Sequence, residues 1–372
     1  MFFYKTRRKF FKEIVEYYDY HKILFQTSKI NPGDKVIYID ISGIAINRYL
    51  YNFLKFFQIN NYTVYLPKNK NIIAQLCRDK GEFKYASWLL KERFVKFDGP
   101  SNSKQILKIS KEQLSNDYFS SFFINKLEKE TYHVPMSEFP GLYYKYDWRE
   151  EFSIEMKRKR SVFMIGNMNR KYYNNIAEEK VFNILSRRAI ADFIFLQKYY
   201  IKINSMIELE RYIQCEIDEK VILIDTFINF TISGEKLKII LKGFDFYLAT
   251  PGIIIPQSHN MIEAMSVGNI PILHKTYANL FRPILQNNIN CLTYETLEEM
   301  NDIINKIFDL PDEKILNLRK NVSEYYIKNL TPEAVVNKIE NNNFTKIFLQ
   351  AEGISLNYLK KQRFLINHGA GI

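Results

Sequence analysis

The segment from residue 244 to residue 273 constrains the fold more than any other part of the chain. It begins with Phe244–Ala249, an apolar run whose length and aromatic content are typical of a buried strand. A proline–glycine pair ends this run, and His259–Val267 then has the pattern of a short helix. A second buried strand is predicted at Ile270–Leu273. The order strand, loop, helix, strand indicates a parallel α/β sheet, in which ligands bind at the carboxyl ends of the strands.

The predicted helix has recognisable ends and one unusual polar side chain. Ser258 suits its N-cap, and Gly268 suits the left-handed position that follows a helix. Glu263 stands in the middle of the helix among apolar residues, and His259 lies one turn earlier on the same face. A carboxylate in that position is either a ligand-binding group or an ordinary helix residue that is exposed or paired with a lysine.

The same alternation of strands and helices extends over the rest of the chain. Strands are predicted at Val36–Asp40, Thr63–Pro67 and Ser161–Ile165. Further helices are predicted at Lys111–Leu127 and, near the end of the chain, at Ile354–Phe364. The first strand is followed by a glycine-containing loop but not by G-x-G-x-x-G, so a dinucleotide site is not expected there. The fold class that this pattern predicts is α/β with a Rossmann-like layout.

The length of the chain bounds its domain organisation. A chain of 372 residues is long enough for two domains. The segment Thr131–Trp148, which contains Pro135, Pro140 and Gly141, is the best candidate for a linker. We expect a first domain at residues 1–150, a second at residues 151–345 and a terminal helix within residues 346–372.

The charge of the chain indicates an anionic partner. The formal net charge is +12, although a compositional bias toward lysine would also produce it. The run Lys157–Arg160 is typical of a solvated face, and nucleic acid is not an expected partner. Residues 1–30 alternate basic and aromatic side chains. They would either lie on an anionic membrane surface or pack on the domain with their lysines solvated.

Cysteine usage and hydropathy indicate the compartment. The three cysteines are far apart, which argues against a disulfide framework and against a metal site. No apolar run reaches the roughly 18 residues that span a bilayer. The first residues carry charges throughout, unlike a signal peptide. We therefore expect a cytoplasmic protein, with peripheral attachment to the inner face of the membrane as the alternative.

The amino-acid sequence of the central segment resembles that of a known family. The run HNMIEAMSVGNIPIL resembles the donor-site signature of GT-B glycosyltransferases, and its sequence is most similar to that of the exostosin-like group. The residues that carry the match are Glu263, Ala264, Gly268, Pro271 and Ile272. In that family the glutamate binds the ribose of a sugar nucleotide. Many retaining members have a second glutamate eight residues earlier, where this chain has an isoleucine; inversion is therefore the expectation, and both stereochemical outcomes stay open.

The resemblance implies a fold and an activity. The fold would be GT-B, with two Rossmann-like domains facing across a cleft, the acceptor side first and the donor side second, and a terminal helix crossing back to the first domain. The activity would be transfer of a sugar from a nucleotide-sugar donor to a glycan or lipid-linked glycan acceptor in surface polysaccharide biosynthesis. No cofactor and no metal are expected, because the chain has no convincing Asp-x-Asp motif and no His/Cys cluster.

The resemblance and the positions of charged residues at strand ends select the candidate site residues. Asp40, after the first strand, is the candidate general base, and the alternative is that it caps the following helix. His133 and Glu138 are weaker candidates for the base. Arg170 is the candidate phosphate clamp and Lys171 the second; the alternative is that both are exposed loop charges. The other donor-site candidates are Gly166, Asn167, Ser258, His259, Asn260, Glu263 and Lys275.

Two other classes of function remain open at this point. The chain could be a non-catalytic GT-B-like module that retains only a nucleotide site, since a fold does not guarantee chemistry. It could also be a basic peripheral membrane protein or nucleic-acid-binding protein whose positive charge is its main functional feature.

Overall fold

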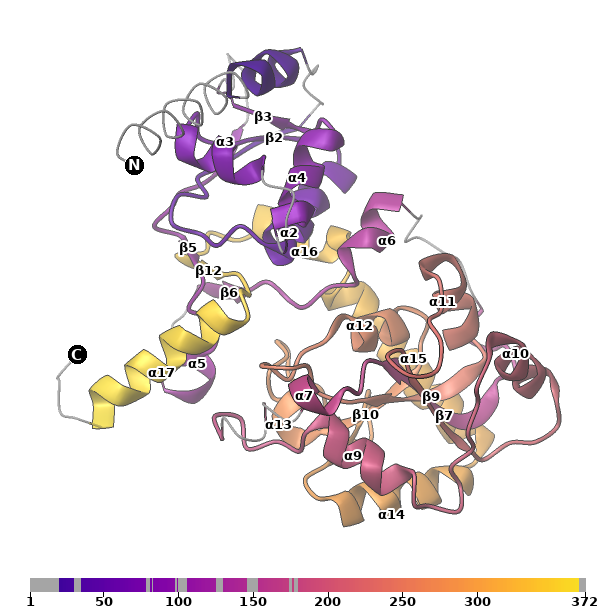
Figure 1. Cartoon of the computed structure of the whole chain (residues 1–372). Helices are drawn as coiled ribbons and strands as arrows, with labels where there is room; N and C mark the ends of the chain where they lie inside the picture. Colours follow the sequence, from indigo (N-terminus) through magenta and orange to yellow (C-terminus); the bar gives the residue numbers. More distant parts are fainter. Residues whose placement is uncertain are drawn as a thin grey trace, which may run out of the picture. The chain divides into compact units, whose positions relative to one another are not determined.

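The computed structural model divides the chain into two compact units. It describes residues 20–29, 35–77, 81, 83–97, 99, 106–124, 130–145, 153–173, 176 and 180–367. The first unit combines residues 1–134 with residues 332–372, and the second comprises residues 135–331. Both units are built on parallel sheets (Figure 1).

The main sheet of the first unit is parallel and has four strands in the order β3-β2-β1-β4. These strands are β1 (Lys35–Ile39), β2 (Tyr62–Tyr65), β3 (Val95–Lys96) and β4 (Ile106–Ile109). Its helices are α2 (Arg48–Ile59), α3 (Lys70–Leu76) and α4 (Phe83–Lys91). Helix α2 begins after Asn47, whose side chain accepts hydrogen bonds from the backbone N–H groups of Tyr49 and Leu50. The two strands predicted in this region are confirmed.

A second, smaller sheet joins the segment that follows β4 to the last part of the chain. Strand β12 (Lys346–Phe348) lies between β5 (Leu114–Ser115) and β6 (Thr131–His133), and all pairings are parallel. A short helix, α5 (Ser120–Phe123), follows β5. Within the described part of the helix predicted over Lys111–Leu127, only Ser120–Phe123 is helical. The prediction is wrong at β5, because this strand pairs with a strand more than 200 residues away in sequence.

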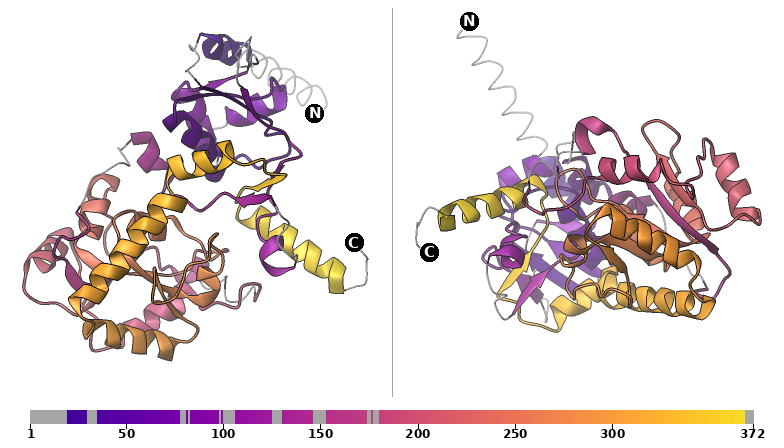
Figure 2. Two further views of the ribbon diagram at one scale, coloured as in Figure 1. Left: turned by 180° about the vertical axis from the view of Figure 1, so that it is seen from behind. Right: turned by 90° about the horizontal axis from the view of Figure 1, so that it is seen from below.

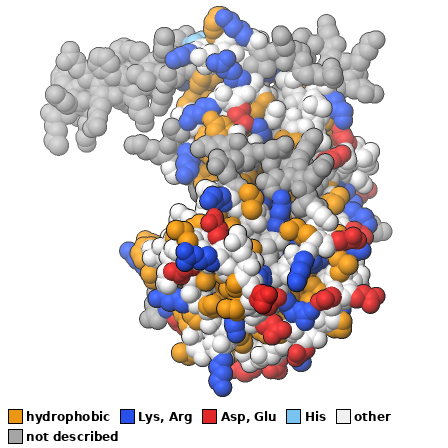
Figure 3. Space-filling model, turned by 90° about the vertical axis from the view of Figure 1, so that its right-hand side faces the viewer, with side chains coloured by type: hydrophobic (Ala, Val, Ile, Leu, Met, Phe, Trp, Pro, Cys, Tyr) orange, Lys and Arg blue, Asp and Glu red, His pale blue; other side chains and the backbone are white. Residues whose placement is uncertain are grey.

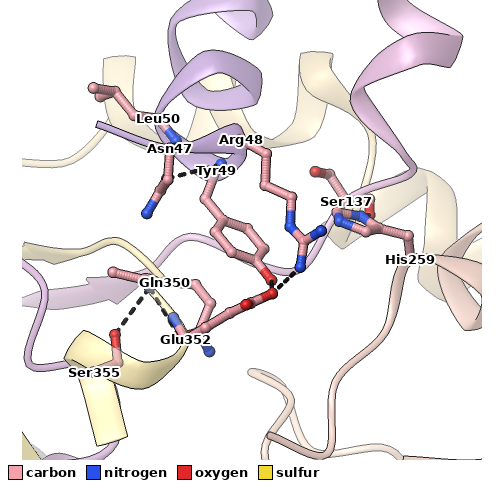
Figure 4. A network of polar contacts seen from close by, with 10 residues as sticks. Asn47, Arg48, Tyr49, Leu50, Ser137, His259, Gln350, Glu352 and Ser355 are labelled. Atoms are coloured by element: carbon pink, nitrogen blue, oxygen red, sulfur yellow. Dashed lines mark hydrogen bonds and ion pairs between the residues drawn. The ribbon is translucent and has the colours of Figure 1, made fainter. Parts of the chain in front are cut away.

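The end of the chain returns to the first unit, as predicted. Its elements there are α16 (Pro332–Glu340), β12 and α17 (Gly353–Asn367). The carboxylate of Glu340 pairs with the Lys35 ammonium at 3.0 Å. The carboxylate of Glu352 accepts a hydrogen bond of 2.7 Å from the Tyr49 hydroxyl and pairs with Arg48 (Figure 4). Helix α17 then lies beside α5 (Figure 2).

The second unit has one parallel sheet of five strands in the order β11-β10-β9-β7-β8. They are β7 (Lys159–Gly166), β8 (Val221–Asp225), β9 (Phe244–Ala249), β10 (Ile270–His274) and β11 (Leu292–Tyr294). Helices cover both of its faces (Figure 1). The described helices of this unit are α6 (Pro140–Lys145), α7 (Arg170–Tyr173), α9 (Arg187–Ile194), α10 (Met206–Gln214), α11 (Gly234–Leu241), α12 (His259–Ser266), α13 (Lys275–Ala278), α14 (Leu297–Phe308) and α15 (Asp312–Asn329).

The central segment folds as its pattern predicts. Strand β9 is buried along its whole length, and so is β10. Helix α12 ends before Gly268, whose φ of 79° is the left-handed conformation expected there. At the opposite end of the sheet, the buried Asp245 carboxylate pairs with the Arg319 guanidinium at 3.2 Å. The predicted fold class, α/β with two Rossmann-like domains and a terminal helix that returns to the first, is confirmed.

The bounds of the two units differ from the expected ones, in which the first domain ended at residue 150 and the returning segment began at residue 346. The segment after Val134 belongs to the second unit, because the backbone N–H of Phe139 donates a hydrogen bond to Glu263. The return begins at Pro332, because α16 packs on α2. No helix within the described ranges is both long and apolar enough to cross a membrane. On the face that Figure 3 presents, Lys and Arg side chains are interspersed with Asp and Glu.

Candidate functional site

The carboxyl edge of the five-stranded sheet collects most of the candidate residues. Because all five strands run in the same direction, the loops after β7, β8, β9 and β10 emerge at one edge. Gly166 ends β7, α12 follows the loop after β9, and Lys275 follows β10. The strand order therefore brings together donor-site candidates that are up to about a hundred residues apart in sequence.

Glu263 is a buried carboxylate on α12. Only 4% of its surface is exposed. Its Oε1 accepts a hydrogen bond of 3.0 Å from the backbone N–H of Phe139. Its Oε2 has no hydrogen-bond partner among the residues that the structure describes. Burial and, after it, the negative charge of Glu138 raise the pKa of Glu263 from 4.5 to about 7. The side chain is therefore not an exposed helix residue, and within the described ranges it forms no ion pair with a lysine.

A second buried carboxylate, that of Glu138, lies near Glu263. Its Oε2 is 3.0 Å from the ammonium of Lys238 on α11. Its Oε1 accepts a hydrogen bond of 2.7 Å from the hydroxyl of Tyr326 on α15. The backbone N–H of Glu138 donates to the Tyr143 hydroxyl at 3.3 Å. Both oxygens of the Glu138 carboxylate are thus occupied by buried partners, an arrangement suited to holding the chain in place.

Sequence reasoning did not identify Lys238 as part of this cluster. Its side chain is only 5% exposed. A signal was present, since Lys238 stands three residues before Leu241 on the buried face of α11. A lysine at a core-facing helix position needs a charged partner. That partner lies a hundred residues earlier, and no local pattern connects the two.

The start of α12 is braced by hydrogen bonds to neighbouring elements. Ser258 occupies the predicted N-cap position, but its side chain makes no cap hydrogen bond, and its backbone N–H donates to the Tyr277 hydroxyl at 2.7 Å. The Nδ1 atom of His259 is 2.6 Å from the carbonyl oxygen of Ser137 (Figure 4). The Asn260 side-chain amide donates to the carbonyl oxygen of Ile165, at the end of β7, at 2.6 Å.

The loop after β7 is shaped by two side chains that the sequence did not single out. Arg187, at the start of α9, is 5% exposed and donates to the carbonyl oxygens of Asn167 at 3.1 Å and Pro251 at 3.0 Å. Asp225, at the carboxyl end of β8, accepts a hydrogen bond of 3.1 Å from the backbone N–H of Met168. A Cβ atom at Gly166 would stand 2.8 Å from Nη1 of Arg187, so the guanidinium occupies the space that this glycine leaves open.

The basic candidates differ in their surroundings. Arg170 is the first residue of α7, and its side chain lies outside the described part of the structure. Lys171 is exposed, with its ammonium 5.7 Å from the centre of the Tyr172 ring. Lys275 is exposed and pairs with the Glu295 carboxylate at 2.6 Å. The hydrogen bond to Glu295 raises the pKa of Lys275.

The candidate general base belongs to the first unit. Asp40 follows β1 directly, and its Oδ1 accepts a hydrogen bond of 2.9 Å from the backbone N–H of Ser42. The helix that follows is capped by Asn47, so Asp40 closes a local turn and does not cap α2. His133, a weaker candidate, is buried, with Nε2 2.7 Å from the Ser121 hydroxyl.

Comparisons with known proteins give distant structural likenesses only. No family model matches the chain, and no curated protein matches it either. Among solved structures, HepE from Anabaena in complex with UDP-glucose is 11% identical, with 82% of this chain and 98% of that chain covered and a TM-score of 0.37. A glycosyltransferase from Rickettsia africae is 13% identical, with coverage of 83% and 99% and a TM-score of 0.39.

A third similar structure is matched over only half of its own length. TarM from S. aureus, as a mutant in complex with Fondaparinux, alpha-GlcNAc-glycerol and UDP, is 14% identical, with 76% of this chain and 50% of that chain covered and a TM-score of 0.30. Likenesses with such TM-scores carry no argument about this chain. Function is therefore argued from the residues of the site, and the resemblance to the exostosin-like group stays a prediction.

Proposed function

We propose that this chain is a GT-B glycosyltransferase that moves a sugar from a nucleotide-sugar donor to a glycan or lipid-linked glycan. Surface polysaccharide biosynthesis is the process that such an acceptor suits. The observation that carries the proposal is the state of Glu263. It is a buried carboxylate beside the carboxyl edge of a parallel sheet, with one oxygen fixed by a backbone N–H and the other without a partner among the described residues.

A buried carboxylate of this kind suits the ribose of a nucleotide. A buried acceptor left without a hydrogen bond costs about 1–3 kcal/mol, and more when it is charged. A ribose offers two neighbouring hydroxyl groups, and hydrogen bonds from hydroxyls to a carboxylate are short and strong. Binding of the ribose would give Oε2 of Glu263 a hydrogen-bond donor, while the Phe139 N–H keeps the carboxylate oriented.

The diphosphate of the donor would lie near the start of α12 and the loop after β7. Backbone N–H groups at the amino end of a helix favour an anion, and α12 has eight residues. Asn260 ties this end of the helix to the end of β7 at Ile165. Arg170, Lys171 and Lys275 are the proposed sources of positive charge for the departing diphosphate, without a metal ion. Lys275 would act with its charge partly offset by Glu295.

The acceptor would be activated by Asp40. In the proposed inverting reaction, the acceptor oxygen attacks the anomeric carbon of the donor sugar while the bond to the diphosphate breaks. The proton of the acceptor hydroxyl goes to the Asp40 carboxylate, and the electron pair of the broken bond leaves with the diphosphate. The hydrogen bond from Ser42 to Oδ1 would orient this carboxylate.

The test is nucleotide binding. Thermal shift and calorimetric titration with UDP, GDP, CDP and ADP, and with their sugar derivatives, should reveal at least one that stabilises the protein. Glu263→Gln should bind that nucleotide at least about tenfold more weakly, the loss expected for a hydrogen bond to a charged group. Glu298→Gln removes the same charge from an exposed position on α14 and should bind like the wild type.

Two results would contradict the proposal. Absence of binding by every nucleotide, at concentrations that saturate known donor sites, would remove the nucleotide-sugar assignment. Unchanged affinity of Glu263→Gln would remove Glu263 from the site. Binding without release of nucleoside diphosphate in the presence of any acceptor would instead favour a non-catalytic module.

A further inference from the structure

One short segment, Ser137–Phe139, is attached by buried polar contacts to three helices of the second unit. The carbonyl oxygen of Ser137 is 2.6 Å from Nδ1 of His259 on α12. The Glu138 carboxylate pairs with Lys238 on α11 at 3.0 Å and accepts from Tyr326 on α15 at 2.7 Å. The backbone N–H of Phe139 then reaches Oε1 of Glu263 at 3.0 Å. The N–H that holds Glu263 is therefore fixed by contacts in each of the two preceding residues.

We propose that Glu138 and Lys238 are positioning residues for donor binding: their ion pair holds the Phe139 N–H against Oε1 of Glu263 and leaves Oε2 for the ribose. This inference rests on the proposed function. It adds two residues that do not touch the nucleotide. Glu138 and Lys238 are 100 positions apart in the sequence, and Lys238 precedes Glu263 by 25 positions. Neither belongs to the segment that resembles a donor-site signature.

Burial supports a positioning role over a surface role. The Glu138 side chain is 0% exposed and the Lys238 side chain 5% exposed, so neither charge is screened by water. The pair alone does not balance the charge of the cluster, because Glu263 is a second carboxylate near the Lys238 ammonium. The groups that face Glu263 are Glu138, Lys238, Tyr143, Tyr326, Tyr247 and, on its own helix, His259.

The two charges of the pair act on Glu263 in opposite directions. The negative charge of Glu138 raises the pKa of Glu263, and the positive charge of Lys238 lowers it. Together with burial they bring it to about 7. An ionised carboxylate is the stronger acceptor for ribose hydroxyls, so wild-type affinity should fall as the pH drops below about 7.

Because the two charges shift the pKa of Glu263 in opposite directions, the pH dependence of nucleotide affinity distinguishes a positioning role from a purely structural one. We would titrate UDP, GDP, CDP and ADP into the full chain at pH values below and above 7. The quantity compared among variants is the pH midpoint, the pH at which the affinity has fallen to half of its maximum. Glu138→Gln should lower the midpoint, because it removes the charge that raises the pKa of Glu263. Lys238→Gln should raise the midpoint. Both should weaken binding at the optimal pH at least about tenfold, through loss of the fixed N–H.

The double variant Glu138→Gln with Lys238→Gln keeps the test valid if either single variant fails to fold, because it removes both charges of the ion pair together. It should lower the midpoint, since Glu138 acts more strongly on Glu263 than Lys238 does. The matched control is Asp245→Asn, which breaks the buried ion pair with Arg319 at the opposite edge of the sheet. It should destabilise the protein and leave the midpoint unmoved.

The outcomes separate this inference from the proposed function. If no nucleotide binds the wild type, or if Glu263→Gln binds as well as the wild type, the proposed function fails and the inference fails with it. If Glu263→Gln weakens binding while the pair variants match the wild type in affinity and midpoint, the inference alone is overturned. Midpoints of the two single variants that move in the same direction would also overturn it.

Discussion

Glu263→Gln should make the protein more stable at neutral and alkaline pH while it weakens nucleotide binding. The carboxylate is buried, and its pKa is raised from the ordinary 4.5 to about 7. The unfolded chain therefore loses the proton of Glu263 at a lower pH than the folded chain does. The amide of glutamine has nearly the same shape, can still accept from the Phe139 N–H, and does not ionise.

The size of the effect follows from the pKa difference. Below pH 4.5 the carboxyl group is protonated in both states, so it costs nothing and the two proteins should be equally stable. As the pH rises from 4.5 to about 7, the wild type loses stability, and above that range the loss is constant. A rise of this size corresponds to about 3 kcal/mol, at roughly 1.4 kcal/mol per unit of pKa.

The assay is urea unfolding of wild type and variant, followed by circular dichroism at several pH values. The difference in the free energy of unfolding should grow from near zero at acidic pH to about 3 kcal/mol in favour of the variant at alkaline pH. Asp245→Asn is the contrasting control: it leaves the Arg319 guanidinium buried without its carboxylate counter-charge, so it should be less stable than wild type. A pH-independent difference, or a less stable Glu263→Gln at alkaline pH, would refute the reasoning.

Three further changes test other parts of the site. Lys238→Met leaves a buried carboxylate unpaired and should lower the free energy of unfolding by about 3–5 kcal/mol in urea titrations. An unchanged urea concentration at half unfolding would show that the ion pair does not stabilise the fold. Gly166→Ala places a Cβ 2.8 Å from Nη1 of Arg187 and should cost about 1–3 kcal/mol in thermal melts, whereas Gly353→Ala, with no atom within 4 Å, should cost less. Asp40→Asn should lower turnover by about 10²–10⁴-fold with donor affinity kept, and wild-type turnover would exclude Asp40 as the base.

Much of the fold could be predicted because its signals are local. The apolar runs of β9 and β10, the breakers between them and the glycine after α12 all act within a few residues. The helix predicted over Lys111–Leu127 failed for the opposite reason. Strand β5 exists because β12 pairs with it from the far end of the chain, and this pairing leaves no trace in the local periodicity.

The candidate site shows the same division between local and distant signals. The position of Glu263 on its helix was predictable, since the helix pattern places it. Its burial was not, because the backbone that covers it comes from Phe139, far earlier in the chain. Arg187 was missed since its role depends on two carbonyl oxygens in other loops. Asp225 could have been found, because it ends a strand as Asp40 follows one.

The most direct measurement is a crystal structure of the full chain with the nucleoside diphosphate that binds it most tightly. We predict that the ribose hydroxyls lie within hydrogen-bond distance of Oε2 of Glu263, with the diphosphate at the start of α12. A nucleotide bound elsewhere, with Oε2 of Glu263 still without a partner, would contradict the account.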